Sequence, residues 1–385
     1  MLINQFVFFP GNYKKLNFDF VDDVVNLDCF SISKSVDDLK ILENPRLKKW
    51  MQHKKFIIFG TGGSSLGGQC IHAVFPNENV KFVCNLDPST LKKVISETDV
   101  NETGFLCISK SGETLETICQ TLLALNLIEE KKNKFVFITE DKTSSLKMIA
   151  DQFDFLCLDH PKNIGGRFSV FSIVGMLPAV LCGIDPLKIR SGGKKILEKY
   201  LSEVECGATF VIKNFMDKIT QHVSFIYSDK LEMFGKWLAQ LYAESTGKVG
   251  VGITPITSVG SVDQHSQLQL YLDGFNDKCF TFFFEKQETD LSISQNTISS
   301  FSCLKDKTVA TIFEAQCNGT MVSILEKSRP TRIIKIPQIT PEILGELFMY
   351  FMLETVFVCK TINVNPFDQP AVESGKLFTK KILGI

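Results

Sequence analysis

Three side chains that could exchange protons with a substrate stand in polar, glycine-containing segments. Glu244 opens the sequence Glu-Ser-Thr-Gly-Lys near the end of an expected helix, with Gln240 one turn earlier. His265 follows a glycine-punctuated stretch, 247–260, and an imidazole titrates near neutral pH. Lys376 lies near the C-terminus. Helix-end carboxylates and C-terminal lysines are usually solvated charges, and lone histidines are usually structural, so none of the three establishes a function alone.

Two loops have the composition of anion-binding sites. Residues 60–68 (GTGGSSLGG) and 109–114 (SKSGET) each follow an expected strand and lead into a helix. Glycines allow a close backbone approach, and the free N–H groups of a helix start attract anions. Each loop alone is equally consistent with a simple turn or helix cap. Two such loops at the carboxyl ends of strands in one sheet favour a phosphate or sugar site.

Arg167 is the third candidate for anion recognition. It follows Gly165 and Gly166 and precedes a long apolar run. A guanidinium stays charged and presents a planar fork to oxyanions, although a solvated or ion-paired arginine is the commoner case for such a residue in isolation.

The elements that must position these residues alternate along the chain. Short apolar strands are expected at 56–59, 81–86, 105–109, 135–139 and 155–158, with helices at 66–75, 90–97 and 113–130 between them. The pattern recurs with strands at 222–227, 278–285 and 332–336 and helices at 231–246, 309–327 and 341–361. Continuous apolar strands alternating with helices predict parallel sheets covered on both faces. A helical stretch, 168–220, joins the two α/β units, with a boundary near 185–205.

Composition excludes several classes of protein. The chain has 385 residues, 44% hydrophobic residues and a net charge of −1, which gives no global electrostatic reason to bind nucleic acid or an anionic membrane. The longest uncharged run, 168–184, contains Gly175 and Pro178 and predicts a buried core helix rather than a membrane span. The N-terminus lacks the layout of a signal peptide. The 12 cysteines show no Cys-x-x-Cys pair and no zinc spacing, so we expect reduced thiols, no metal and a cytoplasmic location.

The order of the motifs resembles that of the phosphoglucose isomerase family. The matching segments are GTGGSSLG at 60–67, SKSGETLET at 109–117, GGRFSVFSIVGMLP at 165–178, ESTGK at 244–248, QHSQLQLYLDG at 264–274 and VESGK at 372–376. They cover most of the chain, and six separated motifs in the family's order form a highly specific match.

The resemblance implies a fold, a reaction and an assembly. The fold is α/β, with two sugar-isomerase (SIS) type α/β/α sandwich domains with mainly parallel sheets, at 1–190 and 191–360, and a C-terminal segment, 361–385, that carries Lys376. The reaction is the reversible aldose–ketose isomerisation of glucose 6-phosphate and fructose 6-phosphate through a cis-enediolate, in glycolysis and gluconeogenesis. It needs no cofactor. The partners are a small-molecule sugar phosphate and a second copy of the chain, in a homodimer with a shared active site.

The resemblance also assigns roles to individual residues. Glu244 is the base, His265 helps to open the sugar ring from the other subunit, Lys376 takes part in the same acid–base step, and Arg167 stabilises the enediolate. The residues expected to bind substrate are Gly63, Ser64, Ser109, Lys110, Ser111, Thr114, Gln240 and Gln369. The chemistry is consistent with this, because one carboxylate can move the proton while a fixed cation stabilises the oxyanion and a phosphate clamp orients the sugar.

Three alternatives stay open. A non-catalytic SIS module would keep the serine loops and lack Glu244 or Lys376, and both are present. An NAD-dependent dehydrogenase would need the third fingerprint glycine where Ser65 stands, although Asp87 lies at the end of the next strand. A dual phosphoglucose/phosphomannose isomerase would share all the motifs.

Overall fold

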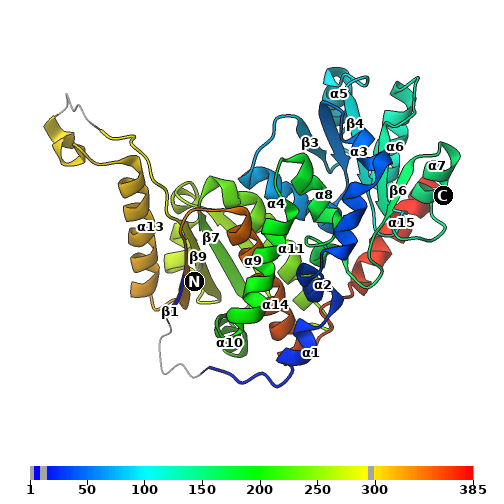
Figure 1. The fold of residues 1–385 in the computed structure, drawn as a ribbon. Coiled ribbons are helices and arrows are strands. Elements are labelled where there is room, and N and C mark those ends of the chain that lie inside the picture. Colours follow the sequence, from blue (N-terminus) through cyan, green and yellow to red (C-terminus); the bar gives the residue numbers. More distant parts are fainter. Residues whose placement is uncertain (1–3, 9–14, 294–298, 385) are drawn as a thin grey trace.

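The chain folds around two five-stranded sheets. The computed structural model describes residues 4–8, 15–293 and 299–384. The first sheet, on the right of Figure 1, is parallel throughout, with the order β3-β2-β4-β5-β6. Its strands are β2 (Lys55–Phe59), β3 (Val80–Val83), β4 (Thr103–Ile108), β5 (Phe135–Thr139) and β6 (Leu156–Asp159).

The second sheet has the order β1-β10-β9-β7-β8, and only its edge strand β1 is antiparallel. Its strands are β1 (Asn4–Phe8), β7 (Gln221–Tyr227), β8 (Thr254–Val259), β9 (Lys278–Glu285) and β10 (Thr331–Ile336). The predicted fold class, two α/β units with mainly parallel sheets, is confirmed. Residues 4–8 belong to the second sheet although the expected first domain starts at residue 1. The division at residues 190 and 360 stays a prediction.

Fifteen α-helices connect and cover the sheets within the described part of the chain. Those up to the middle of the chain are α1 (Val21–Val25), α2 (Asp28–Ser31), α3 (Pro45–Trp50), α4 (Leu66–Val74), α5 (Pro88–Glu97), α6 (Leu115–Leu127), α7 (Ser145–Gln152) and α8 (Ile173–Leu181). The others are α9 (Pro186–Lys199), α10 (Leu201–Met216), α11 (Glu232–Thr246), α12 (Leu268–Asp273), α13 (Val309–Glu326), α14 (Pro341–Thr361) and α15 (Glu373–Leu383). No helix in these ranges combines the length and the apolar character needed to cross a bilayer.

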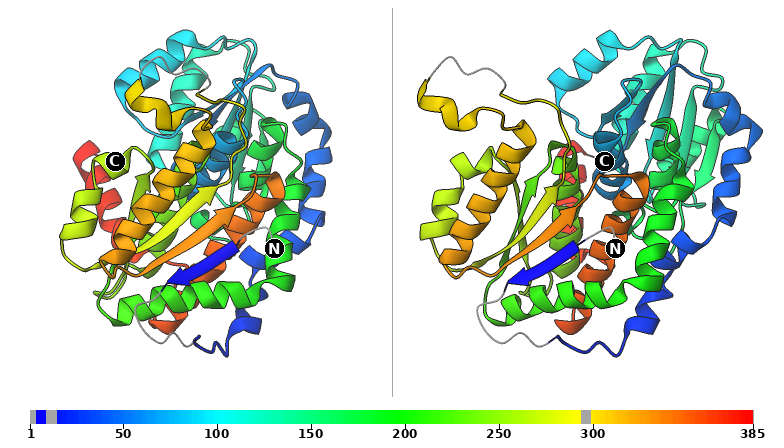
Figure 2. Two further views of the ribbon diagram at one scale, coloured as in Figure 1. Left: turned by 90° about the vertical axis from the view of Figure 1, so that its left-hand side faces the viewer. Right: turned by 60° about the vertical axis from the view of Figure 1, so that its left-hand side comes forward.

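Helices fill the space between the two sheets (Figures 1 and 2). Every residue of α14 from Ile343 to Cys359 is buried, as expected of a helix that is apolar on all sides. It packs against α9, α10 and α11, while α11 contacts α4 and α4 contacts α8. This packing fixes the end of α11, which carries Glu244, against the loops of the first sheet.

Strand β9 shows why a central strand of this sheet has no solvent-exposed face. All eight of its residues are buried, because helices cover both sides of the sheet. Cys279 and Phe283 belong to the core between the sheets, whereas Phe280, Phe282 and Phe284 pack on the outer side with α13. Side chains of a strand alternate between faces, so the phenylalanine-rich run supplies two cores at once.

Two elements differ from the sequence-based expectation. Strand β8 was missed, because the glycines of residues 247–260 suggested a loop. β8 is an edge strand, a position that tolerates its residue Pro255. The long uncharged run forms only the nine-residue α8. Ser172 Oγ accepts from the Val174 N–H at its start, and Gly183, with φ +77°, follows its end.

Candidate active site

Arg167 is the centre of the site. It lies on the 3₁₀ helix η4 (Gly166–Phe168), between β6 and α8, and its side chain is 2% exposed. A guanidinium has five N–H donors, and each of them meets an acceptor. Nε donates to Ser245 Oγ (2.8 Å), Nη1 to Glu244 Oε2 (3.1 Å) and Gln369 Oε1 (2.7 Å), and Nη2 to the carbonyl oxygens of Pro366 and Asp368. Burial lowers the pKa of Arg167, and the Glu244 carboxylate opposes that shift.

Glu244 lies on the last turn of α11, and its carboxylate accepts hydrogen bonds from two side chains. Besides the contact with Arg167, its Oε1 accepts from Gln240 Nε2 at 2.9 Å, one turn earlier on the same helix. The side chain is 32% exposed, so the carboxylate is fixed by its two protein donors and remains accessible to solvent. The buried Gln240 Oε1 has no hydrogen-bond partner in the described residues. The arrangement suits a carboxylate that must accept and return a proton.

The glycine loop lies directly against Arg167. Gly63 belongs to the 3₁₀ helix η3 (Gly62–Ser64), which packs on η4 and α11. A Cβ atom on Gly63 would lie 2.2 Å from the carbonyl carbon of Gly166 and 2.4 Å from the Arg167 nitrogen. Only glycine allows this close approach of Gly63 to the backbone of Gly166 and Arg167.

The serine loop forms a separate group of hydroxyls at the start of α6. Ser109 Oγ lies 2.8 Å from Thr114 Oγ1 and accepts from the Gly112 N–H at 3.2 Å. Ser111 Oγ accepts from the Glu113 N–H at 3.1 Å. Gly112 has φ +70°, a left-handed conformation that favours glycine. The glycine and serine loops follow the neighbouring parallel strands β2 and β4, at the same edge of the first sheet. Hydroxyls at the start of a 13-residue helix can bind a phosphate.

Two further polar residues lie in the serine loop and just after it. The Lys110 ammonium donates to the carbonyl oxygen of Lys162 at 2.8 Å and lies 3.5 Å from Glu140 Oε1, and its role in substrate binding stays a prediction. Thr117, which was not singled out from the sequence, lies on the first turn of α6, and its buried hydroxyl has no partner in the described residues. Its place in SKSGETLET, three residues after Thr114, was the available signal.

Gln369 reaches Arg167 from a segment we call the strap, residues 365–369. The strap connects α14 to the 3₁₀ helix η8 (Pro370–Val372), which precedes α15. Its Phe367 ring packs on the Phe168 ring, with centroids 5.1 Å apart. The strap therefore covers η4 and contacts Arg167 through three residues.

The other two expected acid–base residues lie apart from this group. His265 is exposed on the 3₁₀ helix η6 (Asp263–His265), which follows β8. Lys376 is 64% exposed on α15 and bonds to Glu373 at 2.7 Å. Within the described ranges, no hydrogen bond or ion pair joins either residue to Glu244 or Arg167. One copy of the chain thus brings together Glu244, Arg167 and the two glutamines, but not His265 or Lys376.

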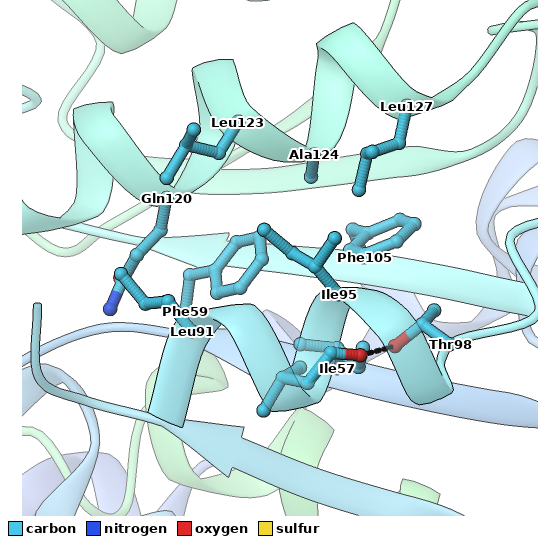
Figure 3. A pocket seen from close by; sticks show the side chains of 11 residues that line it. Ile57, Phe59, Leu91, Ile95, Thr98, Phe105, Gln120, Leu123, Ala124 and Leu127 are labelled. Carbon is cyan, nitrogen blue, oxygen red and sulfur yellow. Dashed lines mark hydrogen bonds between the residues drawn. The ribbon is translucent and has the colours of Figure 1, made fainter. Parts of the chain in front are cut away.

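Two further features of the described residues concern a metal site and an internal cavity. Among residues 4–8, 15–293 and 299–384, no group of three or more His, Cys, Asp and Glu side chains could hold a metal ion. The cavity in Figure 3 lies between α5, α6 and the outer face of the first sheet, and its lining is apolar except for Thr98 and Gln120. Its volume is about 20 Å³, enough for about one water-sized molecule and far too small for a sugar phosphate.

Comparison with known proteins gives consistent matches over most of the chain. A family model described as phosphoglucose isomerase matches residues 48–384. The glucose-6-phosphate isomerase of Rubrobacter xylanophilus is 32% identical over 356 residues, which cover 86% of this chain and 82% of that protein.

Solved structures match as well. A hypothetical protein from Thermus thermophilus superposes with a TM-score of 0.85 at 28% identity, covering 93% of this chain and 90% of that chain. A glucose-6-phosphate isomerase from Chlamydia trachomatis shares the fold, with a TM-score of 0.77 at 21% identity over 97% of this chain and 76% of that chain.

Proposed function

The chain belongs to the phosphoglucose isomerase family, and from that premise we propose that Glu244 moves the proton by which it interconverts glucose 6-phosphate and fructose 6-phosphate. The observation that carries the assignment of Glu244 is its pairing with the buried Arg167, at 3.1 Å, while Gln240 holds the other carboxylate oxygen. A base and a fixed cation in contact are what an enediolate mechanism requires.

The reaction follows from these positions. In the aldose-to-ketose direction the Glu244 carboxylate takes the proton from C2, the C–H electron pair forms the C1=C2 bond, and the carbonyl oxygen O1 becomes an oxyanion. The O2 proton then passes to O1, and Glu244 returns its proton to C1. All five Arg167 N–H donors are occupied. An enediolate oxygen at Nη1 therefore either shares an N–H with Gln369 Oε1 or displaces that oxygen.

The serine loop is proposed as the phosphate clamp. Ser109, Ser111 and Thr114 present hydroxyls at the start of α6, where the helix N–H groups favour an anion. Gly63, Ser64 and the two glutamines line the sugar. In this assignment the phosphate and the reacting carbons are held by different loops, so binding and chemistry can be altered separately.

We further propose a homodimer in which His265 completes the neighbouring site, and in which Lys376 joins the acid–base step. His265 stands in a segment with exposed apolar side chains, among them Val262 and Phe275, the latter 85% exposed. Helix α15 has no buried residue, and it exposes three large apolar side chains, those of Leu377, Phe378 and Ile382. Because a two-fold interface uses the same surface of both subunits, it would bury these apolar side chains in each of them.

A cytoplasmic location is the matching proposal for the compartment. All 12 cysteines are free thiols, and most are buried. Burial raises the pKa of Cys279 and Cys359 to about 12, so these thiols are protonated and unreactive.

The activity is tested with purified protein and two substrates in parallel. Fructose 6-phosphate and mannose 6-phosphate are each supplied alone, and glucose 6-phosphate formation is followed through a coupled dehydrogenase. We expect rapid turnover of fructose 6-phosphate. No turnover by folded protein would refute the proposal, and turnover of mannose 6-phosphate would favour the dual isomerase.

The shared site is tested by mixing two inactive variants, His265→Ala and Glu244→Gln. If His265 serves the other subunit, each heterodimer has one intact site and one doubly altered site. About half the normal activity per heterodimer should then return. Heterodimers that stay inactive would show that each subunit uses its own histidine.

A further inference from the structure

Lys248 is a largely buried lysine just after the helix that carries Glu244. It closes the ESTGK segment, and its side chain is 9% exposed. Nζ donates to the carbonyl oxygens of Glu244 (2.8 Å) and Ser245 (2.7 Å) and lies 3.5 Å from Asp368 Oδ1. An ammonium has three N–H donors, so each has an acceptor within reach.

The backbone of Lys248 is fixed as firmly as its side chain. Its N–H donates to the carbonyl oxygen of Val251 at 3.0 Å, and the Val251 N–H donates back at 2.9 Å. Thr246 Oγ1 accepts from the Ile253 N–H at 3.0 Å, which ties the following loop to the end of α11. The lysine is therefore part of a closed turn.

Burying a lysine beside an arginine costs folding free energy unless its ammonium is hydrogen-bonded and paired. Burial lowers the pKa of Lys248, and the charge of Arg167 lowers it further, while Asp368 opposes both. The carbonyl oxygens at the end of a helix carry partial negative charge, which stabilises a cation there. Lys248 thus replaces water as the partner of the carbonyl oxygens of Glu244 and Ser245 in the last turn of α11.

Asp368 connects Lys248 to the rest of the site. Its backbone carbonyl oxygen accepts from Arg167 Nη2 at 3.1 Å, and its carboxylate faces Lys248. The next residue, Gln369, bonds to Arg167 Nη1. Arg167 and Lys248, which lie in different segments, therefore both contact Asp368 of the strap. The next strap residue, Gln369, supplies the amide oxygen that would compete with substrate for Arg167 Nη1.

We propose that Lys248 is a positioning residue for the isomerisation: it fixes the backbone of Glu244 and the strap together, so that carboxylate and guanidinium keep their relative placement. The inference rests on the proposed role of Glu244. Lys248 acts through Glu244 and Asp368 and does not itself need to touch the sugar.

The proposal predicts a specific kinetic pattern for Lys248→Met, which keeps the side-chain length and loses the charge and the donors. The Glu244 backbone and the strap lose their common anchor, and misplacement of reacting groups by about 1 Å can cost 10²-fold in rate. We expect kcat to fall on the order of 10²-fold with KM and inhibition by inorganic phosphate nearly unchanged, since Lys248 makes none of its hydrogen bonds to the serine loop. Lys236→Met, a 53% exposed lysine on the same helix, is the matched control and should behave like wild type.

Asp368→Asn tests the same contact from the other side. Both single variants should lower kcat, and the double variant Lys248→Met/Asp368→Asn should be little slower than the worse single one, because both remove one coupled interaction. Should Lys248→Met fail to fold, Asp368→Asn still decides the question through its kcat.

Two results would overturn the proposal. One is a folded Lys248→Met enzyme, or Asp368→Asn enzyme, with wild-type kcat and only a lower melting temperature. The other is full additivity of the two substitutions in kcat. Wild-type protein that does not turn over fructose 6-phosphate would instead refute the proposed function, so the two failures are distinguishable.

Discussion

Replacing Glu244 with glutamine tests the chemistry at its most sensitive atom. The carboxylate now accepts two hydrogen bonds, one from Arg167 and one from Gln240. An amide of the same size has a single oxygen, and Arg167, as the charged donor, takes it. The new NH₂ group then faces Gln240, whose unpartnered Oε1 can rotate to accept from it.

The two costs of this substitution differ in size. Stability loses the difference between a charged and a neutral acceptor, about 1 kcal/mol, because the hydrogen-bond pattern can be rebuilt. The reaction loses its base, which costs roughly 10²–10⁴-fold in rate, or about 3–5 kcal/mol of barrier. We therefore expect a folded enzyme with almost no turnover.

The assay combines kinetics with isotope exchange. kcat for fructose 6-phosphate is measured beside thermal unfolding, and wild-type protein in D₂O should introduce deuterium at C2 of glucose 6-phosphate while Glu244→Gln should not. Glu232→Gln, at the other end of α11 and 50% exposed, is the control for a lost carboxylate. A Glu244→Gln enzyme with kcat within about tenfold of wild type would refute the assignment.

Three further predictions address binding, packing and pH. Ser109→Ala and Ser111→Ala should raise KM and weaken inhibition by inorganic phosphate far more than they lower kcat, because each lost charge-assisted hydrogen bond to the phosphate costs about 1.5–3 kcal/mol. Gly63→Ala should lower both activity and melting temperature, because its Cβ would lie 2.2 Å from the Gly166 backbone; Gly319→Ala, inside α13 with nothing within 4 Å, should stabilise by about 0.5–1 kcal/mol. Burial lowers the pKa of His160 from its ordinary value of 6.5 to about 4, so the native state holds this histidine neutral where the unfolded chain protonates it. Its contribution to stability is present above pH 6.5 and is lost as pH falls toward 4, and a denaturation series against pH should show a shallower loss for His160→Asn.

Each of these has a clear contrary result. Serine variants with lower kcat but unchanged KM and phosphate inhibition would place the phosphate elsewhere. Gly63→Ala with wild-type activity would mean that η3 and η4 separate without consequence. An unchanged pH dependence for His160→Asn would show that this histidine does not titrate differently in the folded chain.

Sequence reasoning located the elements well where local pattern decides them. The run Phe135–Thr139 and the helix Pro341–Thr361 were predicted with their observed bounds, because a continuous apolar run and a long apolar helix have few alternatives. β8 was missed because the glycines of residues 247–260 suggested a loop, and the edge position that tolerates its proline depends on the whole topology. The pairing of β1 with β10 joins opposite ends of the chain and leaves no local signal.

The site divides in the same way. The motifs identified Glu244, Arg167 and Gln369 by resemblance, and in the structure Arg167 contacts Glu244, 77 residues away, and Gln369, 202 residues away. Lys110 was placed beside the phosphate by resemblance, and the contact of its ammonium with the carbonyl oxygen of Lys162, 52 residues away, had no local signal. Lys248 was quoted within its motif and given no role, because burial against Asp368 depends on how the strap folds back.

The five contacts of Arg167 have a consequence for the order in which the protein matures during synthesis. The first sheet can form while the ribosome is still translating the second half of the chain, because β2–β6 lie within residues 55–159. Arg167, however, finds three of its five acceptors in residues 366–369, which are made 199 to 202 residues after it. Until they arrive, its guanidinium keeps water as partner, since a buried cation without acceptors is unstable. A nascent chain that stops short of residue 366 therefore lacks the finished arrangement around Arg167 that we propose as the catalytic centre.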